Sequence, residues 1–281
     1  MKSLLRVLVA LAALGFVLVA YVYLTLPDVR ALRTTNPAST AFMELRAREA
    51  AATGKPARHE HRWIAYRRIS PNLKRAVLVA EDDAFWQHEG VDLEQLRETV
   101  EEDLVKGKPM RGASTITQQL AKNLYLSPSR DPSRKLRELI IARRLEAALP
   151  KDRIFELYLN LIEWGDGVWG ADAAARRYFG VSASSLTPSQ AALMAGAIIN
   201  PRVYRVNQPN RRLLRRQAII LSRMSRATPP EPSAPVDAGQ PAEPAAVPAA
   251  PADAGSPDAV PAPETPVPPD AVPPAAAPPA D

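Results

Sequence analysis

Cysteine is absent from the 281-residue sequence. Its absence excludes a disulfide scaffold, a thiolate nucleophile and any metal centre with cysteine ligands. A folded core must therefore be held together by packing alone. Proline, in contrast, is abundant, with 29 residues against 12 glycines, and the net charge is +6. A positive charge of this size favours an anionic partner, such as a membrane surface, a phosphorylated substrate or nucleic acid, without choosing among them.

The segment 228–281 differs in composition from the rest of the chain. It contains 18 of the 29 prolines and eight acidic residues, but no lysine, arginine or aromatic residue. Such a segment cannot bury enough apolar surface to offset its chain entropy, so we expect it to be disordered. Its simplest role is a solvated spacer, and a docking segment or wall-spanning arm is the alternative. Because eight of the 30 acids lie there, residues 1–226 carry a net charge of +14.

The N-terminal residues 1–27 contain a long apolar run. Val7–Leu26 has no charged residue, and as a helix its length matches a bilayer core about 30 Å thick. Lys2 and Arg6 precede the run, which predicts a membrane anchor whose following domain lies outside the cytoplasm. The alternative is a cleaved signal peptide ending at Leu18-Val19-Ala20. It is disfavoured because a bulky leucine stands where a small residue is needed and because the apolar run continues.

Residues 28–227 are sufficient for one domain with a hydrophobic core. Apolar residues spaced three and four apart predict helices almost throughout. These helices are Leu73–Ala84, Leu93–Leu104, Thr117–Tyr125, Arg134–Ala148, Arg153–Leu161, Ala171–Tyr178, Pro188–Ile199 and Pro209–Met224. Only Trp63–Ile69 could form a short strand. The sequence therefore predicts an all-α domain without internal repeats.

A first candidate site lies where an apolar helical stretch ends in Glu81 and Asp82, followed by Phe85 and His88. A carboxylate at the end of a buried stretch is partly desolvated, which raises its pKa and suits a general base. Considered alone, Glu81 could equally be an ordinary helix-end acid. His88 could likewise be a structural histidine.

A second block, Arg111–Asn123, has the pattern of a loop that leads into a helix. Thr115 and Gln118 have the spacing of a capping box. The free N–H groups of this helix start, together with Lys122, could bind phosphate oxygens. A capped helix with no further role would explain the threonine, but not the adjacent glutamines Gln118 and Gln119 or the lysine.

A third block places Arg134 and Lys135 three to four residues before Glu138 on one predicted helix. These residues could form surface ion pairs that contribute a few tenths of a kcal/mol. Alternatively, they form a cationic cradle beside a second acid. A pyrophosphate leaving group needs such a cradle, because negative charge develops on it as its bond breaks.

Taken together and in this order, the blocks resemble the peptidoglycan glycosyltransferases of glycosyltransferase family 51. The resemblance covers residues 38–224, and the absence of a following domain is typical of monofunctional members. It is carried by Glu-Asp-x-x-Phe-x-x-His-x-Gly-Val-Asp at 81–92, Gly-Ala-Ser-Thr-Ile-Thr-Gln-Gln-Leu-Ala-Lys-Asn at 112–123, Arg-Lys-x-x-Glu at 134–138, Arg-Ile-Phe-Glu-Leu-Tyr-Leu-Asn at 153–160, and Trp-Gly-Asp-Gly-Val-Trp-Gly with Ala-Ala-Ala-Arg-Arg-Tyr-Phe within 164–179.

The resemblance implies a mostly helical, lysozyme-like domain that polymerises lipid II on the outer face of the cell inner membrane for cell wall biosynthesis. The β-1,4 linkage forms with inversion, and undecaprenyl pyrophosphate is released. Glu81 matches the catalytic base and Glu138 the second essential carboxylate. Positions that shape the site or hold the pyrophosphate and sugars match Asp82, His88, Thr115, Gln119, Lys122, Asn123, Arg134 and Lys135.

The resemblance also implies the molecules with which the protein works. They are lipid II, the growing glycan chain, the inner membrane and other cell-wall synthesis or division proteins. No cofactor is required, although a divalent cation, Mg²⁺ or Mn²⁺, assists some members. Moenomycin is the expected donor-site inhibitor.

Some features fit this pattern less closely. Gln190 stands where many members have an acid, and Ile198–Pro201 varies a usual Leu-Pro-Asn-Pro; we interpret this late block as structural. The stretch 104–112 combines glycine, proline and three cations, and is either a mobile loop over the substrate or a plain surface connection. His59-Glu60-His61 could bind a metal, but it lies in an expected linker.

Three other classes of function remain to be weighed. A lysozyme-type hydrolase also uses two carboxylates, but it does not need the cations beside the second one. A bifunctional penicillin-binding protein needs a later Lys-Thr-Gly motif, which is missing here. A non-enzymatic binder could use the arginines at 211, 212, 215 and 216. However, no aromatic residues interleave with them, so we expect no nucleic acid and interpret them as a solvated or headgroup-facing surface.

Overall fold

The structure is a computed structural model that describes residues 2–54, 56–94, 97, 114–126 and 132–224. By its contacts the chain divides into two units, Met1–Gly239 and Gln240–Asp281, and every described residue belongs to the first. The loop expected at 104–112 and the proline-rich segment 228–281 lie outside the described residues, as does most of the helix expected at Leu93–Leu104.

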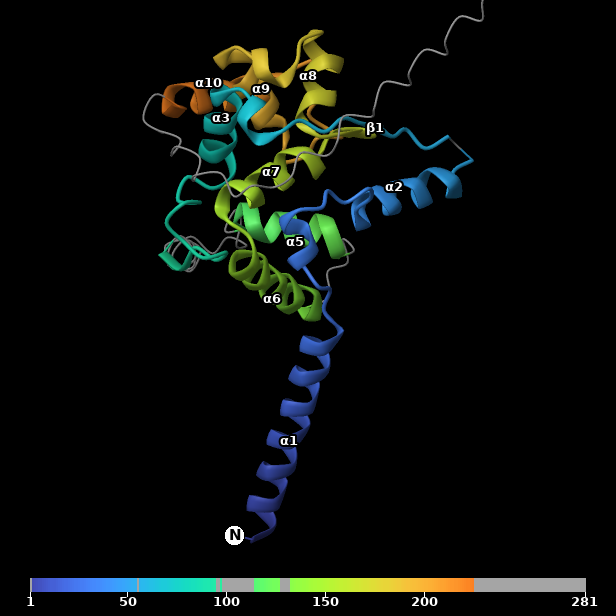
Figure 1. The fold of residues 1–281 in the computed structure, drawn as a ribbon, viewed down its shortest axis with the longest axis vertical. Coiled ribbons are helices and arrows are strands. Elements are labelled where there is room, and N and C mark those ends of the chain that lie inside the picture. The colour runs from blue at the N-terminus through green and yellow to red at the C-terminus, as the bar shows by residue number, and fades with distance from the viewer. Residues whose placement is uncertain (1, 55, 95–96, 98–113, 127–131, 225–281) are drawn as a thin grey trace, which may run out of the picture. The chain divides into compact units, whose positions relative to one another are not determined.

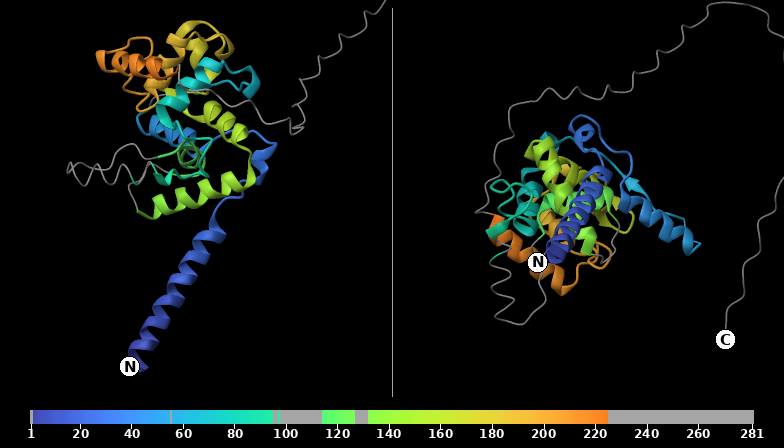
Figure 2. Two further views of the ribbon diagram at one scale, coloured as in Figure 1. Left: turned by 90° about the vertical axis from the view of Figure 1, so that its left-hand side faces the viewer. Right: turned by 90° about the horizontal axis from the view of Figure 1, so that it is seen from below.

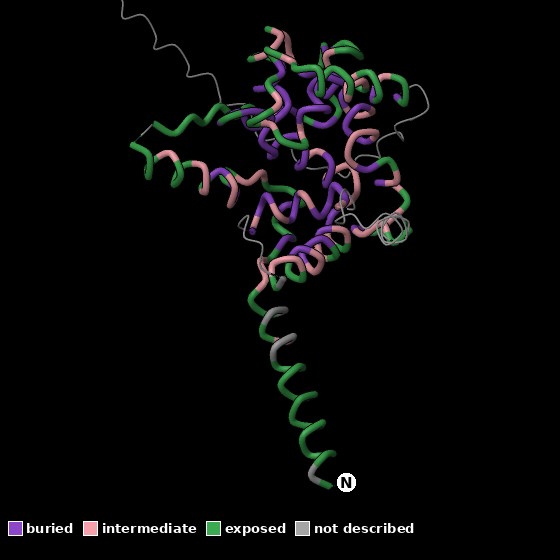
Figure 3. Tube along the Cα trace, turned by 180° about the vertical axis from the view of Figure 1, so that it is seen from behind, coloured by how far each residue is buried: buried purple, intermediate pink, exposed green. Residues whose placement is uncertain are grey.

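The N-terminal segment forms a helix, α1 (Lys2–Thr25), as predicted. Apolar side chains along it are exposed in this structure, including Leu14 and Phe16, which are 66% and 74% exposed (Figure 3). Within the described part of the chain, no helix meets the combined requirements of length and apolarity for crossing a membrane. The helix is therefore confirmed, and its role as an anchor stays a prediction.

Two groups of helices build the domain, and their members pack on one another within each group (Figures 1 and 2). The first group consists of α3 (Pro71–Glu81), α9 (Pro188–Ala197) and α10 (Arg211–Met224). The second consists of α5 (Ile116–Tyr125), α6 (Pro132–Ala148) and α7 (Lys151–Leu161). Each corresponds to a helix predicted from apolar spacing, with ends that differ by at most three residues.

The helix α7 lies at the centre of the core. Its residues Ile154, Phe155, Leu157, Tyr158 and Leu159 are all fully buried. Since they cover more than half of the helix circumference, α7 is packed against neighbours on most sides. Phe155 also meets the rings of Phe85 and Tyr66, with centroids 5.5 and 6.2 Å away. This packing fixes the position of α7 relative to the segment that carries Glu81.

Hydroxyl caps determine where the helices of the site begin. Ser70 accepts a hydrogen bond from Asn72 N at the start of α3, and Thr115 accepts one from Gln118 N at the start of α5. At α9, Thr187 and Gln190 form a complete capping box. Glutamine thus performs at position 190 the backbone-capping task that an acid can perform, which supports the structural interpretation of that position.

The remaining elements include one predicted helix, expected at Ala171–Tyr178, and four elements that were not predicted. The helix α2 (Ala41–Ala52) begins at Thr40, whose side chain accepts from Met43 N. Apolar spacing did not reveal it because Met43 is its one buried residue. The others are η1 (Arg30–Arg33), η2 (Tyr66–Arg68), α8 (Ala171–Phe179) and η3 (Ala183–Ser185).

A small three-stranded sheet is the main departure from an all-α fold. Its strand order is β1-β3-β2, formed by β1 (Glu60–His61), β2 (Glu163–Gly165) and β3 (Val168–Trp169). The pair β1/β3 is parallel, and β2/β3 is antiparallel. Strands of two or three residues are too short for an alternating pattern to be recognised. The strand expected at Trp63–Ile69 is wrong, because that stretch contains η2 instead.

A glycine makes the sheet possible. Gly167 has a φ of +71°, and a Cβ atom at that position would lie 2.5 Å from Arg58 O. Only a residue without a side chain permits this close approach. The carbonyl of Gly167 in turn accepts a hydrogen bond from Glu60 N at 2.9 Å, which joins the chain before α3 to the β2/β3 hairpin.

Candidate active site

Glu81 is the last residue of α3, and its carboxylate is held by a glutamine from another helix. Gln119 Nε2 on α5 donates to Glu81 Oε2 at 2.9 Å. Burial raises the pKa of Glu81, while the Gln119 hydrogen bond and the charges of Arg216 and Lys122 act in the opposite direction. Asp82 adds to the increase. A half-buried carboxylate with a raised pKa is suited to accept a proton, as predicted for this residue.

Glu138 lies on α6 and is 3% exposed, but two cations neutralise it. Arg134 Nη1 donates to its Oε2 at 2.7 Å, and Lys135 Nζ donates to its Oε1 at 2.5 Å. Lys135 Nζ also donates to Gln118 Oε1 at 3.1 Å. The predicted pairs within α6 are therefore present. They are not isolated surface pairs, because they surround a buried carboxylate and connect to α5.

Lys122 on α5 is influenced by both carboxylates. Burial lowers the pKa of Lys122, while the charges of Glu138 and Glu81 raise it and those of Arg134 and Lys135 lower it further. Both predicted catalytic acids therefore act on Lys122 through their charges.

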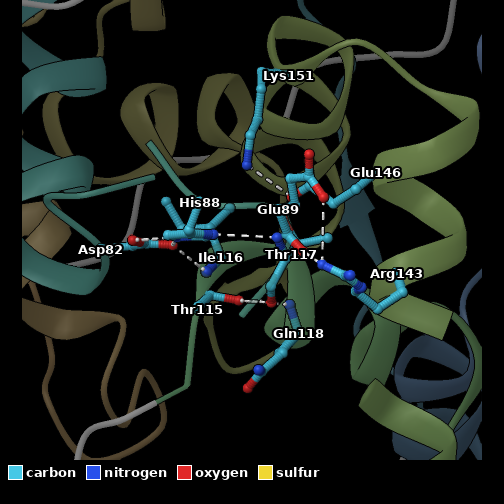
Figure 4. A network of polar contacts seen from close by, with 11 residues as sticks. Asp82, His88, Glu89, Thr115, Ile116, Thr117, Gln118, Arg143, Glu146 and Lys151 are labelled. Atoms are coloured by element: carbon cyan, nitrogen blue, oxygen red, sulfur yellow. Dashed lines mark hydrogen bonds and ion pairs between the residues drawn. The ribbon is translucent and has the colours of Figure 1, made fainter. Parts of the chain in front are cut away.

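Asp82, His88 and Thr115 are brought together in a separate network at the start of α5 (Figure 4). Asp82 Oδ2 accepts from Ile116 N at 2.9 Å, and the two carboxylate oxygens lie 3.0 and 3.1 Å from His88 Nε2. Thr115 Oγ1 donates to Gly90 O at 2.7 Å. These three side chains join the end of α3 to the beginning of α5, which places Glu81 beside Gln119.

The tautomer of His88 follows from the same network. Gly90 N donates to His88 Nδ1 at 3.2 Å, so this nitrogen carries a lone pair and no hydrogen. The hydrogen of the neutral ring is then on Nε2, where it is donated to Asp82. Asp82, His88 and Thr115 thus also support the site by joining α3 to α5, and their substrate-binding role stays a prediction.

A pocket of about 240 Å³ adjoins Gln119 and Lys122. Asn123 also lines it, and its Nδ2 donates to Gln119 O at 2.8 Å. Ile198–Pro201 forms part of the wall. The late block was interpreted as structural, and the turn after α9 brings its residues Ile198–Pro201 to the same pocket as Lys122.

The stretch His59-Glu60-His61 is occupied by contacts within the protein. His61 Nε2 donates to Asn160 O at 3.0 Å, and Arg177 Nη1 donates to Glu60 Oε2 at 2.9 Å. Across the described ranges, no three His, Cys, Asp or Glu side chains form a group that could hold a metal ion. Glu60 and His61 therefore hold strand β1 against the neighbouring elements.

The model of the transglycosylase family matches residues 47–225, more than half of the chain. The chain belongs to this family. A biosynthetic peptidoglycan transglycosylase of Laribacter hongkongensis is 51% identical over 190 residues, which cover 68% of this chain and 83% of that protein. Proteins with the same name from Dechloromonas aromatica and from a Janthinobacterium species are each 48% identical over 195 residues, covering 69% of this chain and 84% of theirs.

In this member of the transglycosylase family, two residues near Glu81 were not predicted as part of the site. Tyr158 is fully buried on α7, and its hydroxyl donates to Gln119 Oε1 at 3.0 Å. Arg216 was expected on an exposed arginine face of α10. Instead it is half-buried, donates to Gly196 O at 3.1 Å and lowers the pKa of Glu81 through its charge.

The sequence contains only partial signals for these two residues. Tyr158 lies in the Glu-Leu-Tyr-Leu-Asn part of a recognised block, but a buried tyrosine in an apolar helix ordinarily indicates core packing. Arg216 follows Leu213 by three residues, and Leu213 is fully buried. That spacing places Arg216 at the edge of the buried face, a signal that could have separated it from Arg211, Arg212 and Arg215.

Proposed function

We propose that the protein is a peptidoglycan glycosyltransferase that polymerises lipid II into β-1,4-linked glycan strands for cell wall biosynthesis. The family match and the names of the relatives support this reaction class. One structural observation carries the proposal: the adjacent Gln118 and Gln119 of α5 bind Lys135, the partner of Glu138, and Glu81 respectively, so a base and a cationic anion site adjoin each other.

In this mechanism Glu81 removes the proton from the 4-hydroxyl of the acceptor N-acetylglucosamine. The hydroxyl oxygen forms a bond to the anomeric carbon of the donor, and the bond from that carbon to the pyrophosphate breaks. Attack from the opposite side converts the α-linked donor into a β-linked product. The raised pKa of Glu81 makes its carboxylate a stronger base than an ordinary glutamate.

The departing undecaprenyl pyrophosphate gains negative charge, which Lys122, Arg134 and Lys135 are placed to stabilise. Glu138 holds two of these cations through its two oxygens. Its role is therefore to position Arg134 and Lys135.

We further propose that α1 anchors the protein in the inner membrane, with the domain on the periplasmic side. The uncharged run of Val7–Leu26, the cations before it and the exposed apolar side chains along α1 support an anchor. The net charge of +14 over residues 1–226 would attract anionic headgroups and the pyrophosphate of the substrate. At the membrane surface, the protein would meet lipid II and other cell-wall synthesis or division proteins.

The assignment is tested by incubating the detergent-solubilised full chain with labelled lipid II and separating the products by gel electrophoresis. We expect a ladder of glycan strands that disappears when moenomycin is added. No polymer under any condition would contradict the proposal. Shortening of preformed glycan strands in a parallel reaction would instead identify a lysozyme-type hydrolase.

A further inference from the structure

A chain of two hydrogen bonds connects the buried centre of α7 to the carboxylate at the end of α3. Tyr158 Oη donates to Gln119 Oε1 at 3.0 Å, and Gln119 Nε2 donates to Glu81 Oε2 at 2.9 Å. Tyr158 has no exposed surface, and the fully buried residues around it fix the position of α7. The glutamine between them is half-buried and borders the pocket that also contains Lys122.

The direction of both hydrogen bonds follows from the chemistry of the groups. An ionised carboxylate can only accept, so the NH₂ end of the Gln119 amide must face Glu81. The oxygen end then faces Tyr158, which must donate. Burial raises the pKa of Tyr158 well above its ordinary value, and the charges of Glu81 and Asp82 raise it further. The hydroxyl therefore keeps its proton and remains a donor.

We propose that Tyr158 is a positioning residue for the proposed base. Its hydroxyl fixes the orientation of the Gln119 amide, so that Gln119 Nε2 donates to Glu81 Oε2. The other oxygen, Glu81 Oε1, is then left to accept the proton of the acceptor hydroxyl. Within the described residues, Glu81 Oε1 has no hydrogen-bond partner. This role depends on Glu81 acting as the base, as proposed above.

The fixed orientation of the Gln119 amide has a consequence for proton transfer. If the amide turned over, its oxygen would face Glu81, and that arrangement is favourable only when Oε2 carries a proton. Turning it over also requires Tyr158 to stop donating and to accept instead. Tyr158 therefore favours the ionised form of Glu81 before the reaction and directs the incoming proton to Oε1.

Three charged groups near Glu81 also shift its pKa, independently of the Gln119 hydrogen bond. Lys122 from α5 and Arg216 from α10 lower the pKa of Glu81 by their charges, and Asp82 beside it raises it. None of these is changed by removing the hydroxyl of Tyr158. A change in the pH dependence of catalysis after that removal therefore reports on the Gln119 hydrogen bond.

The test is Tyr158→Phe, which keeps the buried ring and removes one oxygen. We expect kcat for lipid II polymerisation to fall about fivefold, the loss typical of one hydrogen bond between uncharged groups, with KM changed less than twofold. The acidic limb of the pH profile of kcat/KM should move to higher pH. The matched control is Tyr178→Phe, since Tyr178 Oη donates to Trp164 O at 3.2 Å and does not contact Gln119.

A double-mutant cycle shows whether Tyr158 acts through Gln119. In the Gln119→Ala background, Tyr158→Phe should cause no further loss of kcat, because the group that it orients is gone. Independent, multiplicative losses would overturn the proposal. So would a Tyr158→Phe protein that fails to fold by thermal unfolding, or one whose pH profile matches that of Tyr178→Phe.

Failure of this inference can be distinguished from failure of the proposed function. If Glu81→Gln retains turnover, Glu81 is not the base and the mechanism itself is wrong, whatever Tyr158 does. If Glu81→Gln is inactive while Tyr158→Phe behaves like the wild-type protein, Glu81 remains the proposed base and only the positioning role of Tyr158 is wrong.

Discussion

Gln118 and Gln119 are consecutive residues of α5, and their side-chain amides contact different halves of the site. Gln118 Oε1 accepts a hydrogen bond from Lys135, which is bound to Glu138, whereas Gln119 Nε2 donates to Glu81. One turn of α5 thus sets the spacing between Glu81, the proposed base, and the cation cluster formed by Arg134 and Lys135 around Glu138. This relationship explains why two adjacent glutamines follow a capping threonine, which helix capping alone does not explain.

The cation cluster predicts a specific defect in Lys135→Ala. Lys135 is 44% exposed at its side chain, so its removal should change the melting temperature little. It should lower kcat/KM for lipid II by about 100-fold, because a preorganised charge at the leaving group is lost. Steady-state polymerisation rates and thermal unfolding measure both effects.

Arg137→Ala is the matched control for this substitution. Arg137 is an exposed cation on the same helix, one residue before Glu138. Its removal changes the net charge of α6 equally but leaves the Lys135 and Arg134 contacts in place. Equal losses of activity in the two variants would contradict a site-specific role for Lys135 and indicate a general effect of charge.

The pKa of Glu81 predicts the pH dependence of the reaction. Burial raises this pKa above the ordinary glutamate value of 4.5, and only the ionised form can accept a proton. As the pH is lowered, activity should therefore begin to fall at pH values where an ordinary glutamate is still ionised. Lys122 lowers the pKa of Glu81 by its charge, so Lys122→Met should move the acidic limb of kcat/KM to higher pH. A shift to lower pH would contradict this account.

Much of the site could be predicted because its residues lie in compact blocks. Glu81 and Glu138 were found from an apolar helix ending in acids and from cations spaced one turn before an acid. The helices of the core followed from apolar spacing. The partners of these residues could not be found in that way, since Tyr158 and Glu81 are far apart in sequence and meet only after three helices pack.

The partners of other residues show the same limit. Arg216 was expected on an exposed face, and the packing of α10 on α3 and α9 places it where its charge acts on Glu81. Asp82, His88 and Thr115 were predicted to bind substrate, and their polar atoms also join α3 to α5. In both cases the contacts are tertiary, and no local pattern encodes them.

The hydrogen bonds of Asp82, which connect α3 to the start of α5, predict a loss of stability in Asp82→Asn. Asp82 is 4% exposed and accepts from both His88 and Ile116 N. An asparagine replaces one accepting oxygen with a donating NH₂ group, which sets a donor against a buried donor, at a cost of about 1–3 kcal/mol. Chemical denaturation measures this change.

The neighbouring acid provides a control for Asp82. Asp83 is exposed, and Asp83→Asn makes the same chemical change one residue along the chain. We expect its free energy of unfolding to stay within about 0.5 kcal/mol of that of the unchanged protein. If both variants lost the same stability, the effect would come from net charge and not from the buried network.

The central claim, that Glu81 is the base, is tested most directly by the rate of lipid II polymerisation in Glu81→Gln. The account predicts a loss of about 10²–10⁴-fold in kcat, the usual contribution of a general base. Burial makes the ionised carboxylate unfavourable in the folded state at neutral pH, so the melting temperature should be unchanged or higher. Lipid II binding should also persist. Near-normal turnover in a folded Glu81→Gln protein would contradict the account.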